Sequence, residues 1–190
     1  MRMKDINLLP QEKKILLSLA RAEIKSNLTG ISEKIDLPKG GTLYARHGAF
    51  VTLHKHGNLR GCIGVFTPAQ PLYQTVREMA SFAAFKDPRF VPLTADELSD
   101  IDIEISVLSP LQKISEINEI EIGKHGIYII KELNRGVLLP QVATEHNWDK
   151  ITFLEHTCYK AGLDGDCWRS GAEIYVFTAL IFGENDPGSI

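Results

Sequence analysis

A cysteine and an arginine lie two positions apart in the segment HKHGNLRGCIGVF, residues 54–66. A cysteine becomes a nucleophile when nearby positive charge stabilises its thiolate, and Arg60 is the closest arginine to Cys62 in the sequence. Gly61 and Gly64 are unusual inside a strand, where glycines often mark a bulge or the close approach of a ligand or backbone. The segment therefore predicts either a reactive Cys62 thiol beside a ligand-binding arginine or a small, packed cysteine in a hairpin.

The register of this hairpin decides whether His54 lies next to Cys62. Side chains at positions i and i+2 share one face of a strand, so we expect Arg60 and Cys62 on the same face. A two-residue turn at residues 56–57 would leave His54 and Cys62 on opposite faces, whereas a three-residue turn at residues 56–58 would place them on one face. The sequence leaves both alternatives open.

Four polar residues elsewhere are further candidates. Asp87 and Arg89 lie in the irregular segment KDPRF, which predicts an ion pair, a loop clamp or a contact to a ligand. Glu104 lies on the polar side of an alternating strand, where it would act as an acid, a base or the partner of a cation, or would simply be solvated. Gln141 follows a strand at the start of a short helix, whose first exposed amides could receive an anion.

The hydrophobic pattern indicates the elements that hold these residues. Apolar and polar side chains alternate over residues 100–110, which predicts a strand with one buried face. Amphipathic helices are predicted over residues 10–28, 71–85 and 151–163. Further strands are predicted as hairpins over residues 48–66 and 125–140 and as one buried strand over residues 172–182. Short turns without a regular βαβ alternation favour an α+β fold with a mainly antiparallel sheet flanked by helices.

The charge and hydropathy patterns argue against several functional classes. The 190-residue chain has 21 Lys and Arg against 24 Asp and Glu, a formal net charge of −3, without a clustered basic run. Nucleic-acid binding normally needs a basic face, so no nucleic-acid partner is expected. The apolar runs are far shorter than the roughly 20 residues of a membrane span, and the first residues lack the apolar centre of a secretory signal. We therefore expect a cytoplasmic protein with no membrane partner.

Cysteine and histidine spacing gives little indication of a metal or cofactor. Cys62, Cys158 and Cys167 are an odd and sparse set, so we expect no disulfide framework. His54 and His56 have the spacing of one strand face but no obvious third ligand. Common phosphate-binding and serine-hydrolase motifs are missing from the sequence. No metal and no cofactor are therefore predicted.

Several short blocks, taken in order, resemble the AMMECR domain family. That family is named after a human chromosomal region linked to Alport syndrome, intellectual disability, midface hypoplasia and elliptocytosis. Its hallmark hexapeptide is LRGCIG, here residues 59–64. The other matching blocks are FKDPRFVPLTADEL (85–98), IEISVLSP (103–110), HGI (125–127), LLPQVA (138–143) and KAGL (160–163). The chain is most similar to the bacterial and archaeal branch, which is called AmmeMemoRadiSam system protein A.

The resemblance implies a single domain over residues 8–184, with a larger and a smaller lobe and a cleft bearing the hexapeptide, followed by a polar tail over residues 185–190. It implies association with a Memo-like protein and a radical S-adenosylmethionine protein, but no particular reaction. His54 falls outside the family pattern, which weakens a pairing with Cys62. The residues carried over are Arg60, Gly61, Cys62, Gly64, Lys86, Asp87, Arg89, Phe90, Pro140 and Trp148, together with Glu104 and Gln141 from the microbial form of the pattern.

Two functional hypotheses follow. In the first, a cleft protein or enzyme uses Cys62 on a small molecule or peptide that Arg60 and Arg89 orient. Asp87 or Glu104 would then hold the arginines or transfer a proton. In the second, the chain is a non-catalytic binding or adaptor module in which Cys62 is structural. The sequence does not distinguish an enzyme from a binding module.

Overall fold

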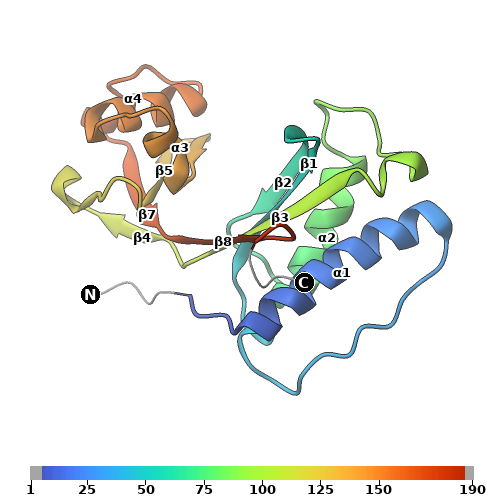
Figure 1. Ribbon diagram of the computed structural model, residues 1–190. Coiled ribbons are helices and arrows are strands. Elements are labelled where there is room, and N and C mark those ends of the chain that lie inside the picture. Colours follow the sequence, from blue (N-terminus) through green and yellow to red (C-terminus); the bar gives the residue numbers. More distant parts are fainter. Residues whose placement is uncertain (1–5, 187–190) are drawn as a thin grey trace. The chain divides into compact units, whose positions relative to one another are not determined.

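The computed structural model describes residues 6–186, and residues 187–190 of the predicted polar tail lie outside this range. The described residues form two units. Unit 1 contains residues 6 and 109–179, and unit 2 contains residues 7–108 and 180–186. Each unit holds one four-stranded sheet, and both sheets are antiparallel (Figure 1). The predicted α+β fold is therefore confirmed, with the strands divided between two sheets.

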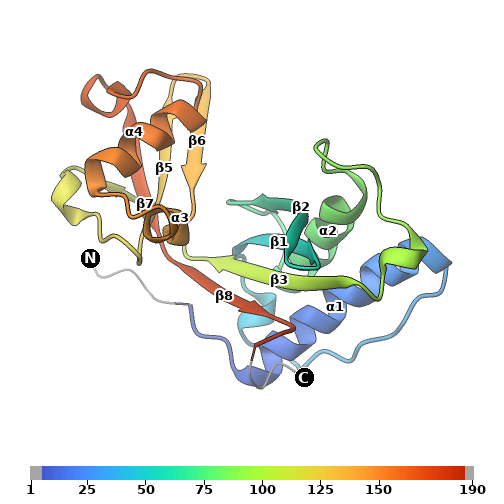
Figure 2. The ribbon, with the colours of Figure 1, turned by 45° about the horizontal axis from the view of Figure 1, so that its top comes forward.

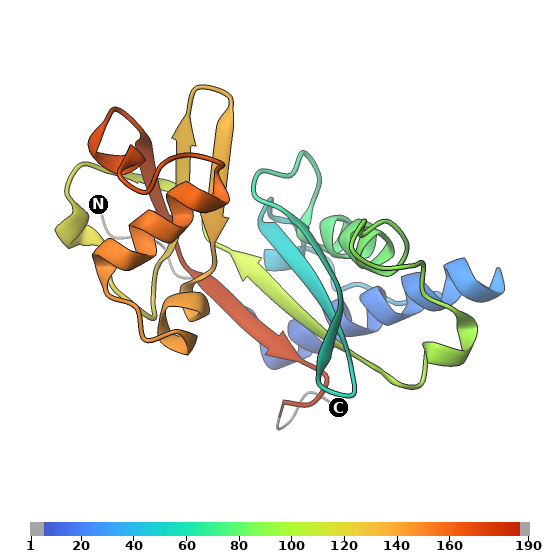
Figure 3. The ribbon, with the colours of Figure 1, turned by 90° about the horizontal axis from the view of Figure 1, so that it is seen from above.

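The sheet of unit 2 has the strand order β2-β1-β3-β8. Its strands are β1 (Gly48–Lys55), β2 (Asn58–Val65), β3 (Ile101–Leu108) and β8 (Ala179–Gly183). Figure 3 shows β8, in red, running beside β3, in yellow-green. Burial along β3 alternates as predicted over residues 101–105, where Asp102 and Glu104 are half-exposed. The predicted alternation ends at Ser106, because the strand is buried on both faces from there to Leu108.

Two helices pack on one face of this sheet. Helix α1 (Pro10–Thr29) and helix α2 (Leu72–Phe85) agree with the predicted helices to within a residue or two (Figure 1). Pro10 occupies the first turn of α1, and Gly30 ends that helix in the left-handed conformation, with φ of 72°. The short 3-10 helices η1 (Thr42–Tyr44) and η2 (Ala95–Glu97) lie in the connections.

Unit 1 packs two helices on its own sheet. The strand order is β4-β7-β5-β6, with β4 (Gln112–Ile114), β5 (Gly126–Lys131), β6 (Asn134–Leu138) and β7 (Glu173–Phe177). Helix α4 (Lys150–Lys160) lies against β5 and β6, and α3 (Pro140–Glu145) precedes it (Figure 2). A Cβ at Gly136 would come within 2.3 Å of the Thr157 carbonyl oxygen, so only glycine allows α4 to lie this close to β6. The unit also contains η3 (Ile117–Glu119) and η4 (Cys167–Arg169).

The prediction of one strand over residues 172–182 is wrong. The segment divides at Thr178 into β7, which belongs to the sheet of unit 1, and β8, which belongs to the sheet of unit 2. Ser109 fixes this division, because its backbone N–H donates to the Thr178 carbonyl and its hydroxyl accepts the Thr178 N–H, both at 2.9 Å. A continuous apolar run does not reveal such a long-range contact.

The structure contains a disulfide, although the sequence predicted no disulfide framework. Cys158 and Cys167 form a disulfide with a Cα–Cα distance of 6.0 Å, and both side chains are buried in unit 1. Gly162, with φ of 73°, ends the turn after α4 and allows the chain to return over that helix. Cys62 is the one free cysteine of the chain. Within residues 6–186, the helices are all too short or too polar to cross a membrane.

Candidate functional site

The β1–β2 hairpin contains a β-bulge at Arg60. His54 pairs with Leu59, but the preceding residue of β1, Leu53, pairs with Gly61, so Arg60 is the extra residue. The turn itself is the two-residue alternative at residues 56–57. Because of the bulge, Cys62 nevertheless shares a face with His54, which the two-residue turn alone would not allow.

Cys62 lies in a row of three polar side chains across three strands. Thr52 of β1 pairs with Cys62 of β2 on one side and with Glu104 of β3 on the other. The Thr52 hydroxyl lies 3.3 Å from the Cys62 Sγ and donates to it. All three residues are half-exposed, on the face opposite the one that α1 and α2 cover. The structure thus places Cys62 and Glu104 on either side of Thr52. The sequence did not point to Thr52, because its position between them depends on the strand register.

The KDPRF segment holds the backbone of Cys62 at the free edge of β2. Asp87 accepts the Cys62 N–H through Oδ2 at 2.9 Å, and Arg89 donates from Nη2 to the Cys62 carbonyl at 3.1 Å. Arg89 also donates to both oxygens of Asp87, at 2.9 and 2.6 Å. The ion pair expected in this loop is therefore present, and its role is to satisfy the outward-facing backbone groups of an edge strand.

The two members of this ion pair differ in exposure. The Asp87 side chain is 2% exposed, and hydrogen bonds from the Arg89 side chain hold its pKa well below its usual range. The Arg89 side chain is 53% exposed, and among residues 6–186 its Nη1 has no hydrogen-bond partner. Arg89 is thus held in a fixed orientation by a buried carboxylate while one of its nitrogens can still receive a ligand.

Arg60 is engaged away from Cys62. Its Nε and Nη2 donate to the two oxygens of Glu97 at 3.0 and 2.8 Å, and its Nη1 donates to the Val91 carbonyl at 3.0 Å. Lys55 also donates to Glu97, at 3.0 Å. The hydrogen bonds from Arg60, and after them the one from Lys55, lower the pKa of Glu97 to about 2. The predicted same-face placement of Arg60 and Cys62 is therefore not found, because the bulge breaks the i, i+2 alternation between them.

The two glycines of the hexapeptide allow close packing rather than positive φ angles. A Cβ at Gly61 would come within 2.2 Å of the Ala83 carbonyl oxygen of α2, and a Cβ at Gly64 within 2.2 Å of the Phe50 ring. The sequence predicted a bulge or the close approach of a ligand or backbone at these glycines. Gly61 lies beside the bulge and meets a helix backbone, whereas Gly64 meets an aromatic side chain. Both glycines thus shape the strand that carries Cys62.

Lys86 and Gln141 do not share these contacts. Lys86 is exposed at the end of α2, and its Nζ lies 4.3 Å from the centre of the Phe82 ring. Gln141 belongs to the first turn of α3 in unit 1, where its Oε1 is buried without a hydrogen-bond partner among the described residues. Its place in a site with Cys62, and the cleft that would contain both, stay predictions. Residues 6–186 contain no group of three or more His, Cys, Asp or Glu side chains that could hold a metal ion.

Comparison with known proteins identifies the family of this chain. A protein of Methanopyrus kandleri is 43% identical over 187 residues, which cover 93% of this chain and 90% of that protein. A protein of Aquifex aeolicus is 43% identical over 153 residues, 76% of this chain and 78% of that protein. The crystal structure of an uncharacterized protein from Pyrococcus horikoshii matches with a TM-score of 0.82 at 37% identity, covering 92% of each chain. A model of the AMMECR1 family matches residues 17–182, and the chain therefore belongs to the AMMECR1 family.

Proposed function

We propose that unit 2 binds a small molecule or peptide at Cys62 and uses the Cys62 thiol on it. The observation that carries this proposal is the contrast between the backbone and the side chain of Cys62. Asp87 and Arg89 hold the backbone on both its N–H and its carbonyl, whereas the side chain stays half-exposed next to a hydroxyl. Such rigid support for an accessible reactive group is what a site for chemistry or ligand contact requires.

Each polar neighbour has a role in this proposal. Arg89 would orient a carboxylate or amide oxygen of the ligand through its available nitrogen. The Cys62 sulfur would bond to the carbon of a ligand carbonyl, and the π electron pair of that carbonyl would move to its oxygen. Because Thr52 lies between Cys62 and Glu104, the thiol proton would pass to Glu104 by way of the Thr52 hydroxyl. Thr52 would position the sulfur through its hydrogen bond. Arg60 would support the site indirectly, because Glu97 and Val91 already use its donors.

Partners and location form part of the same proposal. The family resemblance motivates association with Memo-like and radical S-adenosylmethionine proteins in the cytoplasm, which would supply or consume the ligand at Cys62. Co-purification tests whether the wild-type chain binds each partner. Loss of the complex in a Cys62→Ala variant would indicate that the partner binds at Cys62, whereas an unchanged complex would indicate a contact surface elsewhere.

The test is the rate at which iodoacetamide alkylates Cys62 at neutral pH. Because Cys158 and Cys167 are joined, the oxidised chain carries a single free thiol and needs no background substitution. We expect native Cys62 to react at least as fast as in the chain unfolded by guanidinium without reductant. We expect Arg89→Gln to slow the native reaction, whereas Lys86→Gln, which removes a nearby exposed charge, leaves it unchanged.

A different result would favour the second hypothesis, a binding or adaptor module with a structural Cys62. The observation in its favour is that most polar groups of the hexapeptide region are already used inside unit 2, as in the case of Arg60. Alkylation that occurs only on unfolding, together with unchanged partner binding by Cys62→Ala, would establish that alternative.

A further inference from the structure

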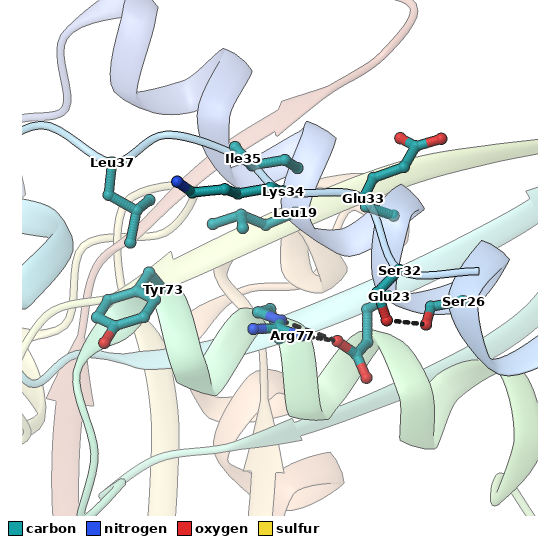
Figure 4. A pocket seen from close by; sticks show the side chains of 11 residues that line it. Leu19, Glu23, Ser26, Ser32, Glu33, Lys34, Ile35, Leu37, Tyr73 and Arg77 are labelled. Carbon is teal, nitrogen blue, oxygen red and sulfur yellow. Dashed lines mark hydrogen bonds and ion pairs between the residues drawn. The ribbon is translucent and has the colours of Figure 1, made fainter. Parts of the chain in front are cut away.

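A hollow in unit 2 lies on the helices, away from the row that contains Cys62. It has a volume of about 270 Å³ and lies between α1, α2 and the segment of residues 32–37, which has no regular secondary structure (Figure 4). Its walls combine apolar side chains with two cations and two carboxylates. Its lining residues include Leu19, Leu37, Tyr73, Glu23, Arg77 and Lys34.

The ion pair of Glu23 and Arg77 forms part of the wall of this hollow. Arg77 donates from Nε to the Glu23 Oε2 at 2.8 Å, and its Nη2 lies 2.6 Å from the same oxygen. The Arg77 side chain is 51% exposed, and its Nη1 has no hydrogen-bond partner among residues 6–186. A neighbouring hollow on the other side shares Glu23 and Arg77 with the first. The guanidinium is thus oriented in advance, which lowers the entropy cost of binding an anion.

The carboxylates of the hollow are already occupied, unlike the cations. Glu23 accepts Arg77 at Oε2 and the Asn27 side chain at Oε1, and Glu33 is paired with Lys25. Lys34 is 93% exposed, and its one ion-pair partner among residues 6–186 is Asp36, at 4.0 Å. In Figure 4 its side chain runs alongside the segment of residues 32–37 toward Leu37. A ligand anion would therefore find available donors, whereas a ligand cation would have to displace an existing pair.

The apolar part of the hollow defines the rest of the ligand. Leu19 is buried, and Leu37 and Tyr73 are half-buried with their side chains directed toward the same space (Figure 4). An apolar body of one ring or a branched chain would cover these side chains and gain free energy by removing their surface from water. Because Glu23 neutralises one charge of Arg77, a monoanion is favoured over a dianion such as phosphate.

We propose that this hollow binds a small organic carboxylate with an aromatic or branched aliphatic body. The carboxylate lies between the Arg77 Nη1 and the Lys34 ammonium, and the body lies against Leu19, Leu37 and Tyr73. The proposal is independent of the chemistry at Cys62, because none of the residues that line the hollow contacts that site.

The test is a titration with 3-phenylpropionate, followed by two-dimensional NMR of the backbone amides. Saturable shifts are expected at residues 32–37 and at the facing turns of α1 and α2, with a dissociation constant of about 1 mM or lower. The uncharged isostere 3-phenylpropionamide should bind at least about tenfold more weakly, because a hydrogen bond to a charged group is lost. Inorganic phosphate should also bind more weakly.

Substitution of each charged side chain shows whether it attracts the carboxylate or competes with it. Arg77→Gln should weaken 3-phenylpropionate binding about tenfold, and Lys34→Gln should weaken it less because that side chain is exposed. Glu23→Gln should tighten it, because Arg77 then loses its competing carboxylate. Lys14→Gln, an exposed lysine of α1 outside the hollow, should change nothing.

Three outcomes would overturn the proposal. They are equal binding of the amide, unchanged or weaker binding by Glu23→Gln, and the absence of localised saturable shifts in the wild type. Thermal unfolding of each variant checks the fold, and Lys34→Gln keeps the test valid if Arg77→Gln proves unstable, because Lys34 lies almost entirely in solvent.

Discussion

The buried carboxylate of Asp87 accepts the backbone N–H of Cys62 at 2.9 Å, across 25 residues of sequence. The contact joins the end of α2 to the edge strand β2, and it fixes the segment that carries the free cysteine. Because Arg89 binds both the carboxylate and the Cys62 carbonyl, a single ion pair satisfies both outward-facing backbone groups of one residue.

Removal of the Asp87 charge should destabilise unit 2. In Asp87→Asn the ion pair with Arg89 is lost from a buried position, so we expect the free energy of unfolding to fall by about 2 kcal/mol. Urea unfolding followed by circular dichroism measures this loss. Both tryptophans, Trp148 and Trp168, belong to unit 1, so tryptophan fluorescence serves as an internal control that should not change. Asp96→Asn, at an exposed position, should have little effect, and an equal loss in both variants would contradict the proposed role of Asp87.

The Arg60–Glu97 pair should make stability depend on pH. The folded-state pKa of Glu97 is about 2, below its ordinary value of 4.5, because Arg60 and then Lys55 hydrogen-bond to the ionised form. The stabilisation is therefore complete above about pH 4.5 and is lost as the pH falls toward 2. Wild type should exceed Glu97→Gln in stability by the most near neutral pH, and this difference should shrink on acidification. A difference that stays constant over this range would show that Glu97 does not act through its charge.

The two glycines of the hexapeptide should differ in their tolerance of alanine. Gly61→Ala places a methyl group against the backbone of α2, which cannot move locally, and should cost about 3 kcal/mol. Gly64→Ala meets the inner atoms of the Phe50 ring, which can move only if the whole side chain takes another rotamer, and should cost about 2 kcal/mol. Gly183→Ala in β8 is the matched control, because its nearest atom is 3.4 Å away. Unfolding of the three variants under one condition gives the order, and a larger loss for Gly64→Ala would refute this explanation.

Reduction of the disulfide should weaken unit 1 selectively. Cys158 and Cys167 are nine residues apart, so the cross-link removes chain entropy worth about 2–3 kcal/mol from the unfolded state. With a reductant, the transition reported by tryptophan fluorescence should move to lower temperature. Amide hydrogen exchange of β1 and β3 in unit 2 should stay the same. A Cys158→Ala and Cys167→Ala double variant should reproduce the effect without reductant.

The sequence was most informative where local periodicity decides structure. The helices and the alternating strand β3 follow from side-chain spacing, and Asp87 with Arg89 followed from their position in an irregular loop. The glycines allowed for a bulge in this strand, but its position at Arg60 could not be predicted, because it depends on tertiary packing such as the close approach of α2 to Gly61. The position of Thr52 between Cys62 and Glu104 depends on the strand register that this bulge sets.

Two other features depend on partners far away in the sequence. The break between β7 and β8 is fixed by Ser109, 69 residues before Thr178. The disulfide depends on the path of the chain after α4, which a count of three cysteines does not reveal. Each of these errors arose where a tertiary contact overrides a local pattern.

The division at Thr178 also has a consequence for the order in which the chain can fold during synthesis. Strands β1, β2 and β3 leave the ribosome first, but their last neighbour, β8, emerges only after the whole of residues 109–178. Unit 1 is continuous over that stretch and can form while β3 still has an open edge. Arg21 of α1 likewise has its ion-pair partner, Glu184, only at the end of synthesis. The Glu184 carboxylate accepts hydrogen bonds from the Arg21 guanidinium and from the Ile103 N–H. The part of the protein that is made first is therefore the part that is completed last.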